Sequence, residues 1–350
     1  MRNVLATAKV CQVIVEVVGV VILPAVAGVG LWAGAVRGPL AAVQFKLKIP
    51  AGGAKVENGR LISWQIVSES PRDAQIELFD QSGGQPLSLS PFQSFPGIKA
   101  ISISDVSVAP SGTIAVAAVA VAADAAPASC LLVYSGAGQL LHAFRLPAER
   151  EPMRLELDEN DRIWALGVGA GFKDPGDVPM VFAYDTDGNV VHEFLRRAQF
   201  AKDAQLTREG PFDGGAVSFG LAGDRVWFFL PASRQLVTLK RDGSDTQIVD
   251  TGLPSPLPSV NPVGLIHAQC RNASLLPSGR FLIQMNFTTE SSVRNDLYEW
   301  DAGKRVWKAL RLGDAVSGRE LFLGGDDTAL SLATFNGLSA EVKAVAVPAP

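Results

Sequence analysis

Polar side chains recur six residues before a series of tight turns in this sequence. Asp105, Asn272 and Glu320 supply carboxylate and amide oxygens, the ligand types that hard divalent cations prefer. Arg154 supplies a fixed cation that could pair with a carboxylate or bind an anionic group. The six positions, in chain order, are Gly52, Asp105, Arg154, Val217, Asn272 and Glu320. If the strands that carry them surround one axis, the polar members could hold a polar or charged ligand, or a divalent metal.

The same residues have a structural interpretation. Polar groups packed between neighbouring sheets must be paired, so ion pairs and hydrogen bonds between repeat units would use the same residue types. Asp105 and Arg154 fall on adjacent units, as do Asn272 and Glu320. We favour bonds between units for these residues, and a ligand site is the alternative.

Histidine and cysteine patterns give no catalytic constellation. Among the 3 histidines, His267 lies nearest the expected axial mouth and is a further candidate lining residue. The sequence has no Gly-x-Ser-x-Gly elbow, phosphate loop, His-x-x-x-His helix or Cys-x-x-Cys pair. Cys130 and Cys270 are expected to be buried free thiols. No catalytic residue and no metal ligand set is therefore assigned, and the cofactor stays unknown, with a divalent metal as the one considered.

The elements that must position these residues are strands in a repeat. Residues 104–147 read as strand, turn, strand, loop, strand, turn, strand, with alternating apolar residues and Gly-containing turns. Six such units can be counted from their first-hairpin turns, which are Asn58-Gly59, Ser111-Gly112, Asn160-Asp161, Gly223-Asp224, Ser278-Gly279 and Asp326-Asp327. The repeat predicts an all-β, six-bladed β-propeller of four-stranded antiparallel blades. Five or seven blades are the alternatives, because units one, four and six depart most from the pattern.

The two ends of the repeat array predict how the ring closes. The last unit, residues 320–347, contains only three strands. A spare strand at residues 43–49 reads like the outermost strands of other units, and we expect it to complete the sixth blade. Such closure removes two open sheet edges. The propeller domain is accordingly predicted to span residues 43–350.

Residues 1–40 are expected to lie outside the propeller. Basic residues precede an apolar run at residues 10–36, which predicts an apolar leader helix. A signal peptide cleaved near residues 24–27 fits this pattern, and so does an uncleaved membrane anchor, because the run is long enough to span a bilayer. Glu16 would be costly in lipid. We expect export to the periplasm or cell exterior, with a membrane tether through residues 10–36 as one route and packing on the domain as the alternative.

Two units carry a resemblance to a known class of propellers. Asp105–Val116 with Leu132–Phe144, and Leu155–Trp164 with Val181–Phe194, repeat one strand-and-turn signature. These residues resemble the six-bladed propellers of the NHL-repeat and TolB-like type. The resemblance covers about residues 43–350 and is specific for the second and third units. It implies the fold and leaves the activity open.

A second resemblance indicates which residue types a metal-dependent propeller enzyme would need. Gluconolactonase-type propellers hold a metal through acidic and amide residues that converge on the axis. Asp105, Asn272 and Glu320 have these residue types, but their spacing is not that family's motif. A metal-dependent hydrolase or lyase is therefore the alternative function.

Charge and repeat pattern together favour a binding role. The net charge is −4 and no basic patch is visible, so nucleic acid is not expected as a partner. Clear blades without a catalytic constellation favour an exported, non-catalytic propeller that binds a protein, peptide or glycan through its loop-bearing faces. A membrane-tethered sensor or scaffold is the third hypothesis.

Overall fold

The computed structural model describes residues 42–70, 75–80, 84–123, 125–147, 150–168, 179–196, 199, 217–231, 233–252, 265–289, 292–310, 312 and 318–348; for 168 and 265–267 it describes the backbone alone. These residues all belong to one compact unit, Gly38–Pro350. The expected leader at residues 1–40 lies outside them. Within the described ranges, no helix has the length and apolar character needed to cross a bilayer.

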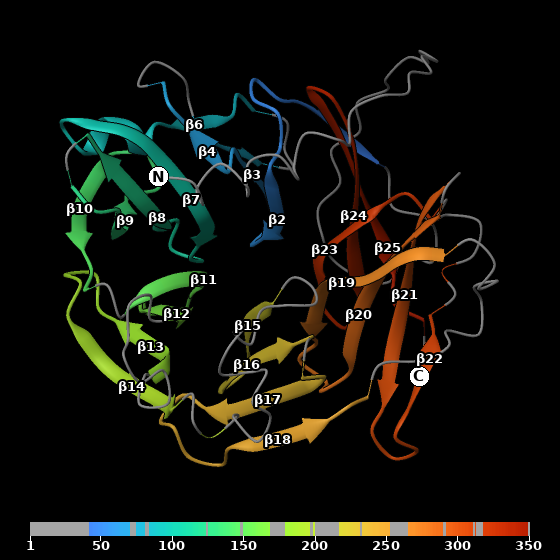
Figure 1. Ribbon diagram of the computed structural model, residues 1–350. Coiled ribbons are helices and arrows are strands. Elements are labelled where there is room, and N and C mark those ends of the chain that lie inside the picture. The colour runs from blue at the N-terminus through green and yellow to red at the C-terminus, as the bar shows by residue number, and fades with distance from the viewer. Residues whose placement is uncertain are drawn as a thin grey trace. The chain divides into compact units, whose positions relative to one another are not determined.

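Strands in this unit form six antiparallel sheets, arranged as blades around a common axis (Figure 1). Blade 1 contains β2 (Gly53–Glu57), β3 (Arg60–Trp64), β5 (Ile76–Asp80) and β6 (Leu87–Leu89). Blade 2 contains β7 (Ile98–Val108), β8 (Ile114–Ala122), β9 (Ala128–Tyr134) and β10 (Leu140–Arg145). Blade 3 contains β11 (Glu151–Leu157), β12 (Ile163–Val168), β13 (Pro179–Tyr184) and β14 (Val190–Arg196).

The second half of the ring continues in the same order. Blade 4 contains β15 (Ser218–Ala222), β16 (Arg225–Leu230), β17 (Gln235–Lys240) and β18 (Gln247–Asp250). Blade 5 contains β19 (Leu265–Leu275), β20 (Phe281–Thr289), β21 (Val293–Asp301) and β22 (Val306–Ala309). Blade 6 contains β23 (Leu321–Gly325), β24 (Ala329–Asn336), β25 (Ser339–Ala346) and β1 (Val43–Lys46). The predicted six-bladed propeller is confirmed.

Two short elements, both between β3 and β7 in the chain, were not predicted. A two-residue strand, β4 (Val67–Ser68), pairs with β7 and adds a fifth strand to blade 2. A single 3₁₀ turn, η2 (Pro91–Ser94), precedes β7. Neither carries the alternating pattern of a full strand, because each is too short to show one.

Turn residues and apolar alternation explain why these strands form. Gly112 and Gly279 close the first hairpins of blades 2 and 5 with φ of 96° and 85°, a conformation that glycine adopts without strain. Apolar side chains of each sheet pack against the next blade, as Trp164 of blade 3 does in a buried cluster with Phe228 of blade 4. Cys130 and Cys270 are buried and free, as predicted.

The N-terminal strand closes the ring as the sequence predicts. β1 pairs antiparallel with β25, with Val43 opposite Val342 and Lys46 opposite Ser339. Phe45 is buried and its ring lies 5.3 Å from that of Phe79 in blade 1. β1 therefore completes blade 6 and also packs against blade 1.

Blades 2 and 5, half a turn apart in the ring, share one strand register. Both innermost strands pair with their neighbours through two register shifts, between Ile98 and Ala100 and between Ile103 and Asp105 in blade 2. Blade 5 repeats the shifts at the matching places, and Asn272 there stands where Asp105 stands in blade 2. Blades 2 and 5 can therefore be compared position by position.

Removing the Phe45 side chain should weaken the packing of β1 that closes the ring. Phe45→Ala is expected to destabilise the protein by about 3–5 kcal/mol, because a buried aromatic ring is lost and a cavity is left. The exposed neighbour gives the control, and Lys46→Ala should change stability by less than about 0.5 kcal/mol. Urea denaturation measures both. Equal midpoints for the two variants would show that β1 does not hold the ring.

Candidate functional site

Side chains of the inner strands bind the backbone of the next inner strand. Asp105 Oδ2 accepts a hydrogen bond from the backbone N–H of Leu155 in blade 3, at 2.9 Å. Its Oδ1 accepts from the N–H of Val106, also at 2.9 Å. Asp105 is buried, so both oxygens are used within the protein interior. The residue thereby joins blade 2 to blade 3.

Arg154 and Asn272 make the same kind of bond at other junctions. Arg154 Nε donates to the carbonyl of Val217 in blade 4, at 2.9 Å. Asn272 Nδ2 donates to the carbonyl of Phe322 in blade 6, at 2.9 Å. These bonds fit the structural interpretation, in which the polar positions fasten one blade to the next.

Two further junctions, between blades 1 and 2 and between blades 4 and 5, are bridged by side chains that do not lie six residues before a turn. Ser218 Oγ accepts from the N–H of Ala273, at 2.8 Å, and joins blade 4 to blade 5. Glu57 Oε2 accepts from the N–H of Val108, at 2.7 Å, and joins blade 1 to blade 2. We call these bonds the inner collar; its side chains are Glu57, Asp105, Arg154, Ser218 and Asn272.

A β-bulge precedes three residues of the inner collar. The strand register shifts between Ile103 and Asp105, and equivalent shifts precede Arg154 and Asn272. A bulge adds one residue to a strand and re-aims the side chains beside it. The bulges therefore explain how these side chains turn from their own sheet toward the neighbouring blade.

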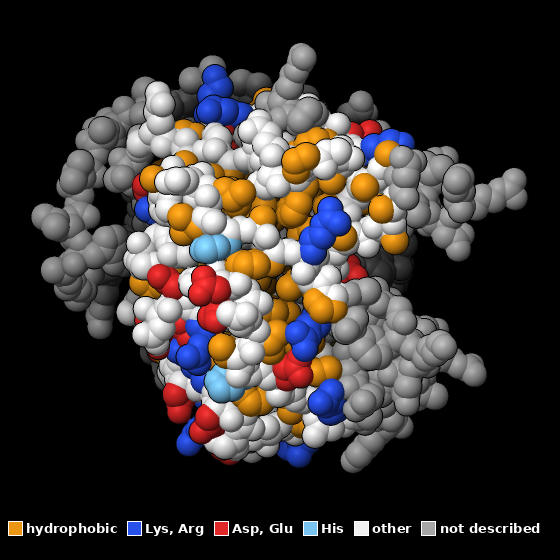
Figure 2. Space-filling view, turned by 90° about the vertical axis from the view of Figure 1, so that its left-hand side faces the viewer, with side chains coloured by type: hydrophobic (Ala, Val, Ile, Leu, Met, Phe, Trp, Pro, Cys, Tyr) orange, Lys and Arg blue, Asp and Glu red, His pale blue; other side chains and the backbone are white. Residues whose placement is uncertain are grey.

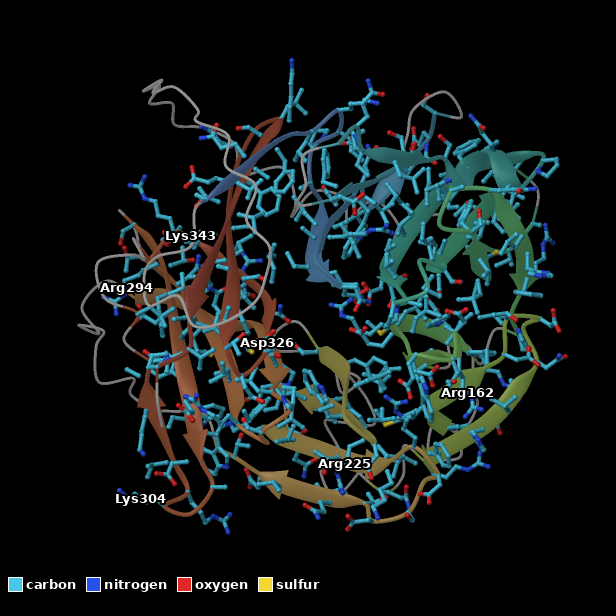
Figure 3. All side chains as sticks on the ribbon, turned by 180° about the vertical axis from the view of Figure 1, so that it is seen from behind. Arg162, Arg225, Arg294, Lys304, Asp326 and Lys343 are labelled. Carbon is cyan, nitrogen blue, oxygen red and sulfur yellow. The ribbon has the colours of Figure 1, made fainter. Side chains whose placement is uncertain are left out.

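The other two predicted residues lie elsewhere. Glu320 is buried, and its Oε1 forms an ion pair, at 2.7 Å, with Nζ of Lys343 in β25 of blade 6. Figure 3 labels Lys343. His267 lies within β19, opposite Thr288, instead of before that strand; its side chain lies outside the described residues. Asp105, Asn272 and Glu320 thus have separate partners. Among the described residues no group of three His, Cys, Asp or Glu side chains could hold a metal ion.

A cluster of charges lies where blades 1, 2 and 3 meet near the axis. Lys55 Nζ forms an ion pair with Glu57 of its own strand and lies 3.6 Å from Asp105 Oδ1 in blade 2. It lies 3.7 Å from Glu156 Oε1 in blade 3 and donates to the carbonyl of Leu155, at 3.2 Å. We call Lys55, Glu57, Asp105 and Glu156 the axial charge cluster. It sets three carboxyl groups against one ammonium group.

Burial and mutual repulsion shift the titration of this cluster. Burial raises the pKa of Glu156 well above its ordinary value, and the charge of Glu57 raises it further, whereas Lys55 acts in the opposite direction. Burial alone would lower the pKa of Lys55, but Asp105, Glu156 and Glu57 together raise it. Lys55 is therefore charged, while Glu156 holds its proton more strongly than an exposed glutamate does.

The cluster is only partly closed to solvent. The Lys55 and Glu57 side chains are 14 % and 13 % exposed, and the Glu156 side chain is 22 % exposed. Lys55 reaches from blade 1 past blade 2 to blade 3, which is possible only on the axial side of the inner strands. A group approaching along the axis could therefore reach these carboxylates.

Half a turn away, the equivalent junction closes without these charges. The register next to each turn makes Ala222 the counterpart of Glu57, and Gly220 the counterpart of Lys55. Gly324 is likewise the counterpart of Glu156. Of the four positions, only that of Asp105 stays polar, as Asn272, which donates to the carbonyl of Phe322 in blade 6 where Asp105 accepts from the N–H of Leu155. The equivalent junction thus closes without any of the charges, although Glu57 also supplies a hydrogen bond of the inner collar.

Comparisons with known proteins give the fold. A Bacteroides fragilis protein described as exported superposes with a TM-score of 0.51 at 12% identity, over 89% of this chain and 96% of that chain. Streptogramin B lyase gives 0.45 at 13% identity over 87% and 98% of the two chains, and YCF48 bound to D1 peptide gives 0.43 at 10% over 90% and 98%. No family model and no curated protein matches the chain.

Two variants of Asp105 separate its hydrogen bonds from its charge. Asp105→Ala should cost about 1–3 kcal/mol, because the buried N–H of Leu155 loses its acceptor. Asp105→Asn keeps only one of the two acceptor oxygens that bind the N–H groups of Val106 and Leu155, so it should lose stability, but less than Asp105→Ala. Guanidinium denaturation measures the difference. Equal losses in both variants would show that the charge, and not the hydrogen bond, is what the ring requires.

Glu156 should make stability depend on pH in a defined direction. Its folded-state pKa lies above the ordinary 4.5, so the folded protein binds the proton more tightly than the unfolded chain. The stabilisation is complete below pH 4.5 and is lost as the pH rises through the raised pKa. Glu156→Gln, which cannot ionise, should therefore melt higher than the parent at neutral pH, with the gap closing below pH 4.5. Melting curves that differ equally at all pH values would contradict this.

Proposed function

We propose that this chain is a non-catalytic β-propeller that binds a protein or peptide partner on the axial side of blades 1–3. The observation that carries the proposal is the axial charge cluster, which the equivalent junction of blades 4–6 lacks. Partly buried charges are expensive, and they are commonly neutral or unfavourable for stability compared with apolar residues. Their presence on one side of the ring therefore points to recognition.

The composition of the cluster favours a cationic group of the partner. Three carboxyl groups share one lysine, so the cluster is short of positive charge. A lysine or arginine side chain, or a free amino terminus, would supply that charge through charge-assisted hydrogen bonds. A neutral glycan would not. This argument ranks a peptide or protein above a glycan as the partner.

The described outer side of blades 2 and 3 does not single out another docking area. Figure 2 views the side of the propeller that carries β10 and β14, where apolar side chains lie among charged ones. Leu140, Leu141 and Val191 are exposed there. Scattered exposed apolar residues are ordinary on soluble proteins, so the axial charge cluster is the better candidate.

Export is the second part of the proposal. It is supported by the sequence, where basic residues precede an apolar run at residues 10–36. The full-length gene product, expressed with a C-terminal tag, should appear outside the cytoplasm on cell fractionation. A protein that stays wholly in the cytoplasm would contradict export and leave the binding proposal unaffected.

Peptide binding tests the main proposal. Short acetylated peptides that contain lysine or arginine should bind the full chain, with affinity falling as salt increases. Glu156→Gln combined with Glu57→Gln should weaken binding roughly tenfold or more, equivalent to about 1.4 kcal/mol. Fluorescence anisotropy measures both effects, with acidic peptides and a neutral oligosaccharide as comparison ligands.

Asp187→Asn is the matched control, because Asp187 is an acidic residue that is 72% exposed on the outer part of blade 3. It should leave the affinity within about twofold. Equal binding of acidic and basic peptides, or an unchanged affinity in the double variant, would refute the proposed site.

A further inference from the structure

A buried carboxylate fastens the closing strand at the junction of blades 6 and 1. Glu77, the second residue of β5, is fully buried. Its Oε2 accepts hydrogen bonds from the backbone N–H groups of Lys48, at 2.7 Å, and Ile49, at 3.3 Å. Both belong to the link between β1 and β2. Glu77 therefore holds the segment that carries the chain from the closing strand into blade 1.

The other oxygen of this carboxylate lacks a partner. Glu77 Oε1 is buried and makes no hydrogen bond to any described residue. The same is true of Ser63 Oγ, whose side chain is also fully buried. Ser63 and Glu77 stand directly opposite each other on β3 and β5, so their side chains lie side by side on one face of blade 1. Two buried polar atoms without a hydrogen-bond partner, Ser63 Oγ and Glu77 Oε1, thus belong to neighbouring side chains on one face of blade 1.

The equivalent place in blade 4 contains no such pair. Counting from the first-hairpin turn, Phe228 and Val237 are the counterparts of Ser63 and Glu77, and both are buried in an apolar cluster. Blade packing at this position therefore works with apolar side chains. Of the two blades compared, the polar pair occurs in the one that the closing strand enters.

We propose that Ser63 and Glu77 hold an internal water molecule between blades 1 and 6. The water donates a hydrogen bond to Glu77 Oε1 and accepts one from the Ser63 hydroxyl. Buried waters in proteins satisfy this kind of otherwise unpaired group, and leaving such a group unpaired destabilises the fold. The water fixes one carboxylate oxygen, which leaves the other aligned on the N–H groups of Lys48 and Ile49. Ser63 and Glu77 are in this sense positioning residues for ring closure.

A high-resolution crystal structure of the full chain tests the site directly. The expected result is an ordered water about 2.6–3.2 Å from both Ser63 Oγ and Glu77 Oε1. A direct bond between the two side chains, a space without density, or a metal ion with shorter contacts to several oxygens would each overturn the proposal.

Hydrogen exchange tests what the water does. Ser63→Ala removes one partner of the water and should speed exchange of the Lys48 and Ile49 amides about tenfold, relative to the parent. Ser88→Ala is the matched control, since Ser88 is the next residue in the same row, opposite Glu77, but is exposed and accepts its hydrogen bond from the side chain of Lys48, at 3.4 Å from Nζ, and not from the backbone. It should leave these amides unchanged. Unaltered exchange in Ser63→Ala would overturn the positioning role, and the crystal structure of the parent protein decides the water site should that variant not fold.

Discussion

Hydrogen bonds from inner-strand side chains to the backbone of the next blade are the interaction on which this ring depends. Among the described strands, the innermost one of each blade has an edge with no partner strand, except where β4 pairs with part of β7 in blade 2, and its buried backbone groups must be paired. Asp105, Arg154 and Asn272 do this across three junctions. Because each bond joins one blade to the next, the same contacts satisfy the strand edges and set the order of the blades.

The inner collar distinguishes the hydrogen bonds between blades, which the fold needs, from the charges that one half of the ring has in addition. Asn272 keeps one junction closed with a neutral amide, while Asp105 does so within a group of charges. Lys55 and Glu156 have only glycine as counterparts in the other half of the ring. An internal comparison of this kind needs no related sequence, because blades 2 and 5 share one strand register and blades 1 and 4 pair in the same way next to their turns. It separates the hydrogen bonds of the collar from the extra charges, to which our proposal gives a role in recognition.

Much of this architecture could be predicted from the sequence, and the limits have physical causes. Turn residues and apolar alternation predicted the blades, and the need to cover sheet edges predicted that residues 43–49 complete blade 6. The sequence predicted that polar side chains recur at one position of the inner strands. Their hydrogen-bond partners could not be predicted, because β-bulges redirect the side chains of Asp105, Arg154 and Asn272. Lys55, Glu57 and Glu156 were missed, since counting from the turns selected one position per strand. The alternation of Lys55 and Glu57 on β2 was the available signal.

The most direct test of the account is the stability of a neutral cluster. Lys55→Met, Glu57→Gln and Glu156→Gln together remove the extra charges, while glutamine keeps an acceptor for the N–H of Val108. If the charges serve recognition, the free energy of unfolding of this triple variant at neutral pH will equal or exceed that of the parent. A loss of several kcal/mol would show that the ring itself depends on them and would contradict the account.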